Sequence, residues 1–283
     1  MFNIKLENEY GDILEFSQNS PFTITEISGL HPPDATINTS EIALFDGGKF
    51  NSSKVNMRSI NMTIAIEYEA AKNRIGLYKV LKPKQYIKLY YKGSYRDVNI
   101  EGYIQSMQID YFEVKQLVHL AILCPFPYFR AAQEMINDID SVISLFHFPF
   151  AITASDPIPL GYIETLSDIM IRNEGDVQCG MMIELYARGT VKNPKIFNYL
   201  TGKFIGLNFT MIAGDSIFIN TQAGKKSVQL LREGQYSNIF NTLIKNIEWL
   251  QLDVGENTFT YEAESGVNSL YITFTHTPIF EGV

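Results

Sequence analysis

The stretch that does most to decide the fold is Leu117–Phe129, LVHLAILCPFPYF. Every second residue from Val118 to Cys124 is apolar, and most of the residues between them are apolar as well. An apolar run of this length with both faces apolar predicts a strand buried on both sides. Pro125 and Pro127 follow, and two prolines in three residues end a strand because proline has no N–H to donate. The stretch therefore predicts a buried strand that closes a first domain near Phe129.

Most segments before this stretch also predict strands. Apolar residues alternate on both sides of the turn-like Glu9–Asp12, which indicates a hairpin, and they alternate again from Ile60 to Ile66. Glu67–Leu81 differs, because its apolar residues recur at helical spacing and Pro83 stops the pattern. We expect one amphipathic helix there, packed on a sheet, since a lone helix of this length is marginal in water. Its expected apolar positions are Ala71, Ile75, Leu77, Tyr78 and Leu81.

The second half consists of short strand-like runs separated by turn signals, which is typical of a β-sandwich or jelly-roll. Asn238–Asn246 could add one or two helical turns, with Ser237 as N-cap. Residues 131–140 have both helical and strand character; we assign them as a linker and residues 141–149 as a strand. The expected runs are 168–172, 181–187, 203–212, 216–221, 227–231, 258–262 and 269–276.

Composition and charge exclude several classes of protein. The chain has 283 residues, 46% hydrophobic and 19% charged, which excludes a disordered chain and favours two domains. No apolar run approaches the roughly 18 residues of a transmembrane helix, and the acidic, alternating start is not that of a signal peptide. The formal charge of −8 argues against a general nucleic-acid binder. Residues 1–130 hold 14 bases and 14 acids, whereas residues 131–283 hold 9 and 17.

One basic segment is prominent within the neutral half. Residues 70–96 contain eight Lys and Arg and no acid. The simpler interpretation is a solvated helix face followed by an exposed strand. The alternative is a contact surface for an acidic partner, which suits the charge difference between the two halves and assembly into a ring.

No catalytic, cofactor or metal site is expected. The four histidines are too far apart in sequence for a metal motif, and Cys124 and Cys179 lie in or beside apolar runs as buried, reduced thiols. Gly214-Asp215-Ser216 is similar to the start of a serine-hydrolase motif, but a tight turn explains it better. Gly224-Lys225-Lys226-Ser227 lacks the upstream glycine of a P-loop.

Several segments, spread over nearly the whole chain, are informative through their order and spacing. They are Gly29–Pro33 with the following ATINTSEIALFDGGKFNSSKV, Tyr78–Pro83, Arg96–Tyr103, Cys124–Phe129, Asn173–Val177, Asn193–Ile196, GLNFTMIAGDSIFINT and Phe280–Val283. Together they resemble the phage distal tail protein family. This chain has Phe126 where the family often has an acidic residue.

The resemblance implies a mainly β protein in a virion tail tip, of a phage or prophage, made in the host bacterial cytoplasm. Residues 1–130 would be an N-terminal ring-forming domain, a β-sandwich with one helix. Residues 141–283 would be a galectin-like, jelly-roll β-sandwich after the linker 131–140. The expected assembly is a homo-hexameric baseplate hub that joins the tail tube protein to a tail-associated fibre or lysin protein, and possible receptor-binding proteins would sit on the second domain. No membrane and no sequence-specific nucleic acid is implied, since DNA only passes through the ring.

Within that assembly we expect Lys79, Lys82, Lys84 and Lys88 at a subunit or tail-tube contact. The alternative function is a carbohydrate-binding module that contacts the host cell wall through the C-terminal domain. An enzyme is a third hypothesis that rests on Ser216 alone.

Overall fold

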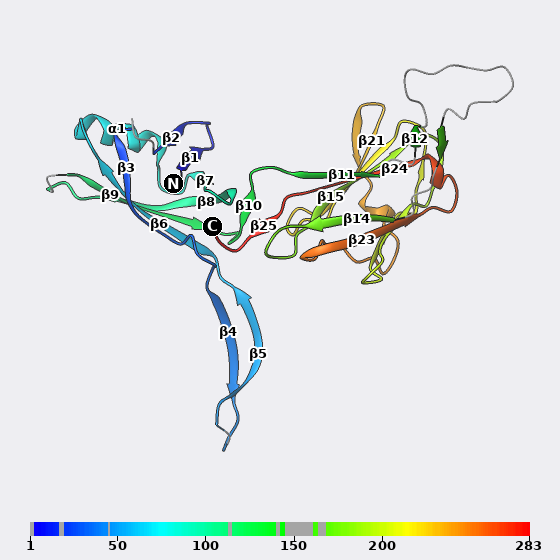
Figure 1. Ribbon diagram of the computed structural model, residues 1–283, viewed down its shortest axis with the longest axis horizontal. Helices are drawn as coiled ribbons and strands as arrows, with labels where there is room; N and C mark the ends of the chain where they lie inside the picture. Colours follow the sequence, from blue (N-terminus) through cyan, green and yellow to red (C-terminus); the bar gives the residue numbers. More distant parts are fainter. Residues whose placement is uncertain are drawn as a thin grey trace. The chain divides into compact units, whose positions relative to one another are not determined.

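The structure is a computed structural model that divides into two compact units. Unit 1 comprises Met1–Ala132 together with Ile279–Val283, and unit 2 comprises Gln133–Pro278 (Figure 1). Within the part of the chain that the structure describes, no helix is long and apolar enough to cross a membrane. The described residues are 3–16, 20–44, 46–112, 115–139, 142–144, 161–163 and 168–283.

Unit 1 is built from one antiparallel nine-stranded sheet, one helix and a separate two-stranded hairpin. The main path of the sheet runs β2-β1-β7-β8-β9-β6-β3, and β10 pairs with both β8 and β25. The elements are β1 (Asn3–Asn8), β2 (Ile13–Glu15), β3 (Phe22–Ser28), β4 (Ala35–Glu41), β5 (Gly48–Val55), β6 (Arg58–Ile66), α1 (Ala70–Val80), β7 (Tyr86–Lys92), β8 (Asp97–Ile109), β9 (Leu117–Cys124), β10 (Phe129–Ala131) and β25 (Ile279–Phe280).

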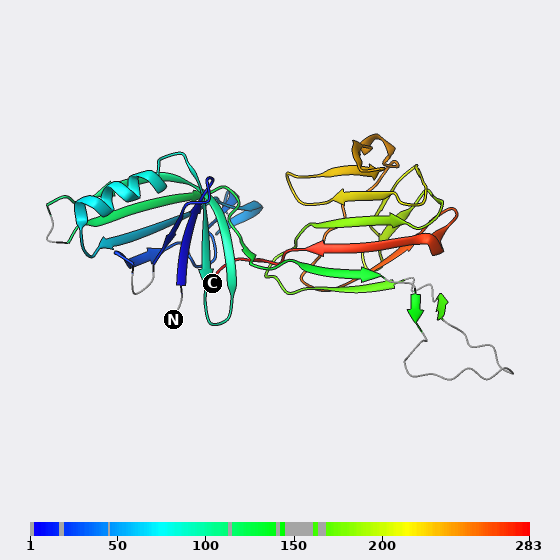
Figure 2. The ribbon, with the colours of Figure 1, turned by 90° about the horizontal axis from the view of Figure 1, so that it is seen from above.

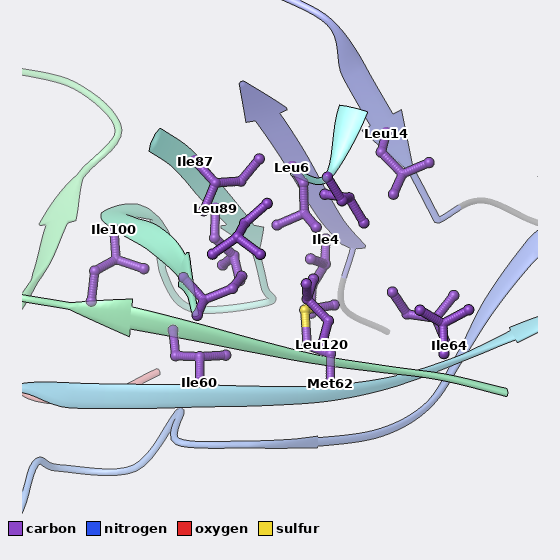
Figure 3. Close-up of a cluster of buried hydrophobic side chains, with 14 of the residues drawn as sticks. Ile4, Leu6, Leu14, Ile60, Met62, Ile64, Ile87, Leu89, Ile100 and Leu120 are labelled. Atoms are coloured by element: carbon purple, nitrogen blue, oxygen red, sulfur yellow. The ribbon is translucent and has the colours of Figure 1, made fainter. Parts of the chain in front are cut away.

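The two layers of unit 1 come from this one sheet, which bends along the long strand β8. The first part of β8 pairs with β7, its last part pairs with β9, and its register shifts between Ile104 and Ser106. A bulge of this kind bends a strand. Side chains of β1 and β7 then face those of β6 and β9 across a buried apolar core (Figure 3). The expected sandwich with one helix is confirmed. Its two layers belong to one bent sheet rather than to two separate sheets.

Helix α1 lies on this sheet with less burial than its sequence predicts (Figure 2). The expected range Glu67–Leu81 shortens to Ala70–Val80, and Leu77 is the one buried residue within it. Leu81, directly after the helix, is also buried, whereas Ile75 is 55% exposed. The helix therefore meets the core through Leu77 and Leu81, with Ala70 and Val80 packed partly against it. Of the predicted apolar positions, Ala71 and Ile75 are exposed instead.

Unit 2 is a β-sandwich. A six-stranded sheet, β11-β24-β15-β20-β21-β22, and a four-stranded sheet, β14-β23-β17-β18, face each other, and the rings of Phe259 and Phe274 stack between them at 5.3 Å. The elements are β11 (Met135–Ile139), β12 (Val142–Ser144), β13 (Gly161–Ile163), β14 (Asp168–Asn173), β15 (Met181–Ala187), β16 (Val191–Lys192), β17 (Lys195–Asn198), β18 (Phe204–Gly206), β19 (Thr210–Met211), β20 (Ser216–Asn220), β21 (Ser227–Arg232), β22 (Gln235–Asn238), η1 (Phe240–Thr242), β23 (Gly255–Glu262), η2 (Val267–Ser269) and β24 (Leu270–His276).

Three expectations change in detail. Within the expected linker 131–140, Met135–Ile139 form β11, which joins the six-stranded sheet by pairing with β24. Residues 142–144 form β12, and the rest of the expected strand 141–149 lies outside the described residues. The expected strand 203–212 is broken into β18 and β19, which pair with different partners. Strand pairing uses main-chain groups that all residues share, so a local pattern does not reveal it.

Candidate functional site

The β4–β5 hairpin of unit 1 protrudes from the sheet (Figure 1). Nearly every residue of β4 and all of β5 are exposed, including large apolar side chains. Those side chains are Ile37 on β4 and Phe50 and Val55 on β5, and the turn between the strands adds Ile42 and Leu44; Phe50 is 60% exposed. An isolated two-stranded hairpin is marginal in water, and exposed apolar surface of this kind marks an interaction site.

The base of the hairpin is held by a buried arginine at the start of β6. Arg58 is 3% exposed, and its guanidinium donates hydrogen bonds to four main-chain carbonyls. Two of these carbonyls, of Gly29 and His31, belong to the segment that leads into β4, each at 2.6 Å. The others belong to Pro127, at 2.6 Å, and to Glu281. Burial lowers the pKa of Arg58 below its usual range.

Position 29, at the base of the hairpin, requires glycine. Its φ is +86°, and a Cβ atom there would lie 2.2 Å from the carbonyl oxygen of Ser59. Any side chain at this position would push the hairpin base off β6.

The segment Ile279–Val283, here named the clasp, completes unit 1 from the far end of the chain. Its first residues form β25 beside β10, with Ile279 opposite Arg130 and Phe280 opposite Phe129. Arg96 donates a hydrogen bond of 2.6 Å to the carbonyl of Gly282 and lies 4.4 Å from the ring centre of Phe280. The main-chain N–H of Val283 donates to the carbonyl of Leu30 at 3.2 Å.

Four of the segments that carry the family resemblance meet at this place. Gly29–Pro33, Arg96–Tyr103, Cys124–Phe129 and Phe280–Val283 are far apart in sequence, and each supplies a contact to Arg58 or to the clasp. Arg58 itself was not identified from the sequence. The available signal was its position two residues before Ile60, on the inward face of a strand whose other inward residues are all apolar.

The four predicted contact lysines lie in two different environments. Lys79, Lys82 and Lys84 are exposed at the end of α1 and in the turn to β7. Lys88 stands in register between Glu7 on β1 and Glu101 on β8, and its Nζ is 5.1 Å from the ring centre of Tyr90. The acid-free sequence is therefore not acid-free in space, because neighbouring strands bring carboxylates to Lys88.

The Gly214-Asp215-Ser216 triplet forms the expected tight turn. Gly214 has φ +92°, and Asp215, 1% exposed, accepts a hydrogen bond from the N–H of Ile212 at 2.8 Å. Arg232 binds both oxygens of Asp215, at 2.8 and 2.6 Å, and holds the pKa of that carboxyl below its usual range. Ser216 donates to the carboxylate of Glu184 at 3.0 Å.

The remaining candidates have structural surroundings. Cys124 and Cys179 are buried and free, and burial raises the pKa of each thiol to about 12. His276 is 1% exposed, and burial lowers its pKa. Among the residues that the structure describes, no group of three or more His, Cys, Asp and Glu could hold a metal ion.

Unit 2 contains one aromatic cluster around the chain's single tryptophan. The ring of Trp249 lies 5.8 Å from that of Phe240, and the Nζ of Lys226 is 5.3 Å from its centre. A sugar platform needs an open ring face, and Trp249 is half-buried with these two neighbours beside it. The carbohydrate-binding alternative stays a prediction.

Comparison with known proteins agrees with this architecture. Residues 174–278 match the family model of the siphovirus-type tail component, C-terminal domain. No curated protein matches the chain. The fold is similar to that of the Dit protein of phage SPP1, with a TM-score of 0.69, 14% identity, and 98% of this chain and 99% of that chain covered. It is also similar to chains of the phage p2 baseplate in its activated conformation, with Sr (TM-score 0.53) and with Ca (TM-score 0.50), each 13% identical with 98% of both chains covered.

The residues matched in unit 2 and the fold of the whole chain are therefore similar to those of siphovirus-type phage tail components. The resemblance to the distal tail protein family is confirmed, with its C-terminal domain recognised in unit 2 and its fold found over the whole chain.

Proposed function

We propose that the protein is a structural, non-catalytic hub of a phage or prophage tail tip, in which unit 1 assembles into a hexameric ring. The observation that carries the proposal is the exposed apolar β4–β5 hairpin. Closed rings form from head-to-tail contacts between unlike surfaces of identical subunits. A protruding arm with apolar side chains suits such a contact, because burying them on a neighbour contributes roughly 25 cal/mol per Å².

The ring joins the tail tube protein to a tail-associated fibre or lysin protein, and DNA passes through it. Unit 2 lies outside the ring and carries receptor-binding proteins. The likeness to SPP1 Dit, described as a paradigm of the hub adsorption apparatus in phages that infect Gram-positive bacteria, supports this assignment.

The hairpin provides the direct test. Replacing Leu44 and Phe50 with serine is expected to abolish ring formation and to leave the subunit's stability within about 0.5 kcal/mol, because both side chains are exposed. Native mass spectrometry and negative-stain microscopy, with tail tube protein present, measure the assembly. The control is Lys54→Ser, an exposed position of the same hairpin without apolar surface. Rings of normal size and amount in the double serine variant would contradict the proposal.

The exposed lysines provide a second test. Lys82→Glu combined with Lys84→Glu is expected to weaken assembly at least tenfold at low salt, and less at 0.5 M salt, because exposed charges are screened. Lys225→Glu combined with Lys245→Glu makes the same change in net charge on exposed positions of unit 2 and serves as the control. Equal assembly of the two double variants would show that Lys82 and Lys84 belong to a solvated surface and make no contact in the assembly. Lys88 is expected to contribute to the sheet of unit 1 instead, through Glu7 and Glu101.

A further inference from the structure

We infer that unit 1 contains a groove for an extended peptide, filled by the clasp, and that filling this groove fixes the base of the β4–β5 hairpin. The groove is formed by the edge of β10, by Arg58 and Arg96, and by the segment that leads into β4. Strand addition of this kind gives affinity through main-chain hydrogen bonds and specificity through individual side-chain sites.

The contacts of the clasp define what the groove accepts. The guanidinium groups of Arg58 and Arg96 bind the successive carbonyls of Glu281 and Gly282, so main-chain direction and position are recognised. Phe280 stacks under Arg96 at 4.4 Å, which favours an aromatic residue. A Cβ atom at Gly282 would lie 3.1 Å from the carbonyl oxygen of Leu30 and 3.2 Å from Pro32, which favours glycine. The ligand is therefore an extended peptide with the pattern aromatic-X-Gly.

The same atoms that bind the clasp also hold the hairpin. Arg58 contacts Glu281 through Nη2 and the carbonyls of Gly29 and His31 through Nη1. The carbonyl of Leu30, between those two residues, accepts the hydrogen bond from Val283. An empty groove leaves that carbonyl and one guanidinium nitrogen without these protein partners, and a buried polar group without a partner is costly. The hairpin base and the clasp are thus coupled through one arginine and one carbonyl.

This coupling has a consequence for the order of folding. The clasp follows unit 2 in the sequence, so unit 1 is completed only after unit 2 has been synthesised. The next step rests on the proposed ring. A nascent chain that still lacks the clasp has a loosely held hairpin base and does not join the assembly. The clasp thus acts as a checkpoint that delays assembly until residues 279–283 have been made.

The test compares the full chain with a variant that ends at Pro278, by amide hydrogen exchange. The variant is expected to exchange at least tenfold faster at the hairpin base, including the N–H of Asn56 that donates to Asp34, with unit 2 unchanged. Adding an acetylated peptide of residues 278–283 restores protection saturably, and the same peptide with Phe280→Ala and Gly282→Val does not. Unchanged exchange at the hairpin base, or equal rescue by both peptides, would overturn the inference.

A point variant keeps the test decisive if the shortened chain does not fold. In the full chain, Gly282→Val is expected to raise exchange at the hairpin base, whereas Val283→Ala, which keeps its main-chain hydrogen bond to Leu30, leaves it unchanged. Equal exchange in the two variants counts against the groove. Assembly is measured separately: a full chain that forms no ring contradicts the proposed function, and a clasp-less chain that forms normal rings contradicts the checkpoint.

Discussion

Replacing Arg58 with methionine is expected to lower the free energy of unfolding of unit 1 by about 3–5 kcal/mol, the usual cost of breaking a buried charged network on one side. Methionine keeps the apolar stem of the side chain but ends where the guanidinium begins, so the position of the guanidinium carbon, 4.6 Å from the ring centre of Phe129, is left empty. The four carbonyls lose their donor, and each buried acceptor left unpaired costs about 1–3 kcal/mol before water or relaxation compensates.

The measurement can separate the two units. Trp249, the only tryptophan, belongs to unit 2, so its fluorescence follows unit 2 while circular dichroism follows both. In urea, the variant should lose the circular dichroism signal of unit 1 at lower denaturant and keep the fluorescence transition. Arg96→Met is the matched control: it removes a less buried guanidinium that binds the same clasp and should cost about 1 kcal/mol. Equal losses in the two variants would show that burial of Arg58 does not set the cost.

Replacing Asp215 with asparagine is expected to lower the free energy of unfolding of unit 2 by about 2 kcal/mol at pH 7, the scale of a buried charge-assisted hydrogen bond. The carboxylate is buried and binds Arg232 at both oxygens, and it caps the turn through Ile212. Arg232 is 38% exposed on its side chain, so water replaces part of what the ion pair supplies and the loss stays below that of a fully buried pair.

The pH dependence of this loss follows from the direction of the pKa shift. Arg232 lowers the pKa of Asp215 in the folded state. The stabilisation is therefore complete above the unfolded pKa of about 4 and is lost as the pH falls through the lower folded value. Urea unfolding followed by Trp249 fluorescence at pH 7 and pH 3 should show a difference between the chain and its variant that shrinks at pH 3. Ser216→Ala, which removes the bond to Glu184 and leaves the pair of Asp215 and Arg232 intact, is the control for changes that do not come from this pair.

Residues 70–96 show which features of a charged surface can be predicted from the sequence and which cannot. The absence of acids is a fact of sequence, and Lys79, Lys82 and Lys84 do lie exposed as a run of like charges predicts. Lys88 differs from these three lysines, because Glu7 and Glu101 lie opposite it on the neighbouring strands and determine its surroundings. The β4–β5 hairpin was outside the strand prediction as well, since its almost fully exposed strands lack the alternation that a buried face imposes.

The sequence by itself determined what local periodicity encodes: the mainly β character, the turn near Glu9–Asp12, the single helix ended before Pro83, and the strand that two prolines end. These features depend on side chains only a few residues apart. Burial of this last strand on both sides was predicted wrongly, because β9 buries one face and leaves the other half-buried or exposed. Only the tertiary structure decided that β25 returns to unit 1 and that Arg58 joins the hairpin base to the clasp. The physical reason is that these contacts are made to main-chain carbonyls. Every residue carries one, so no pattern of side chains predicts which carbonyls are used.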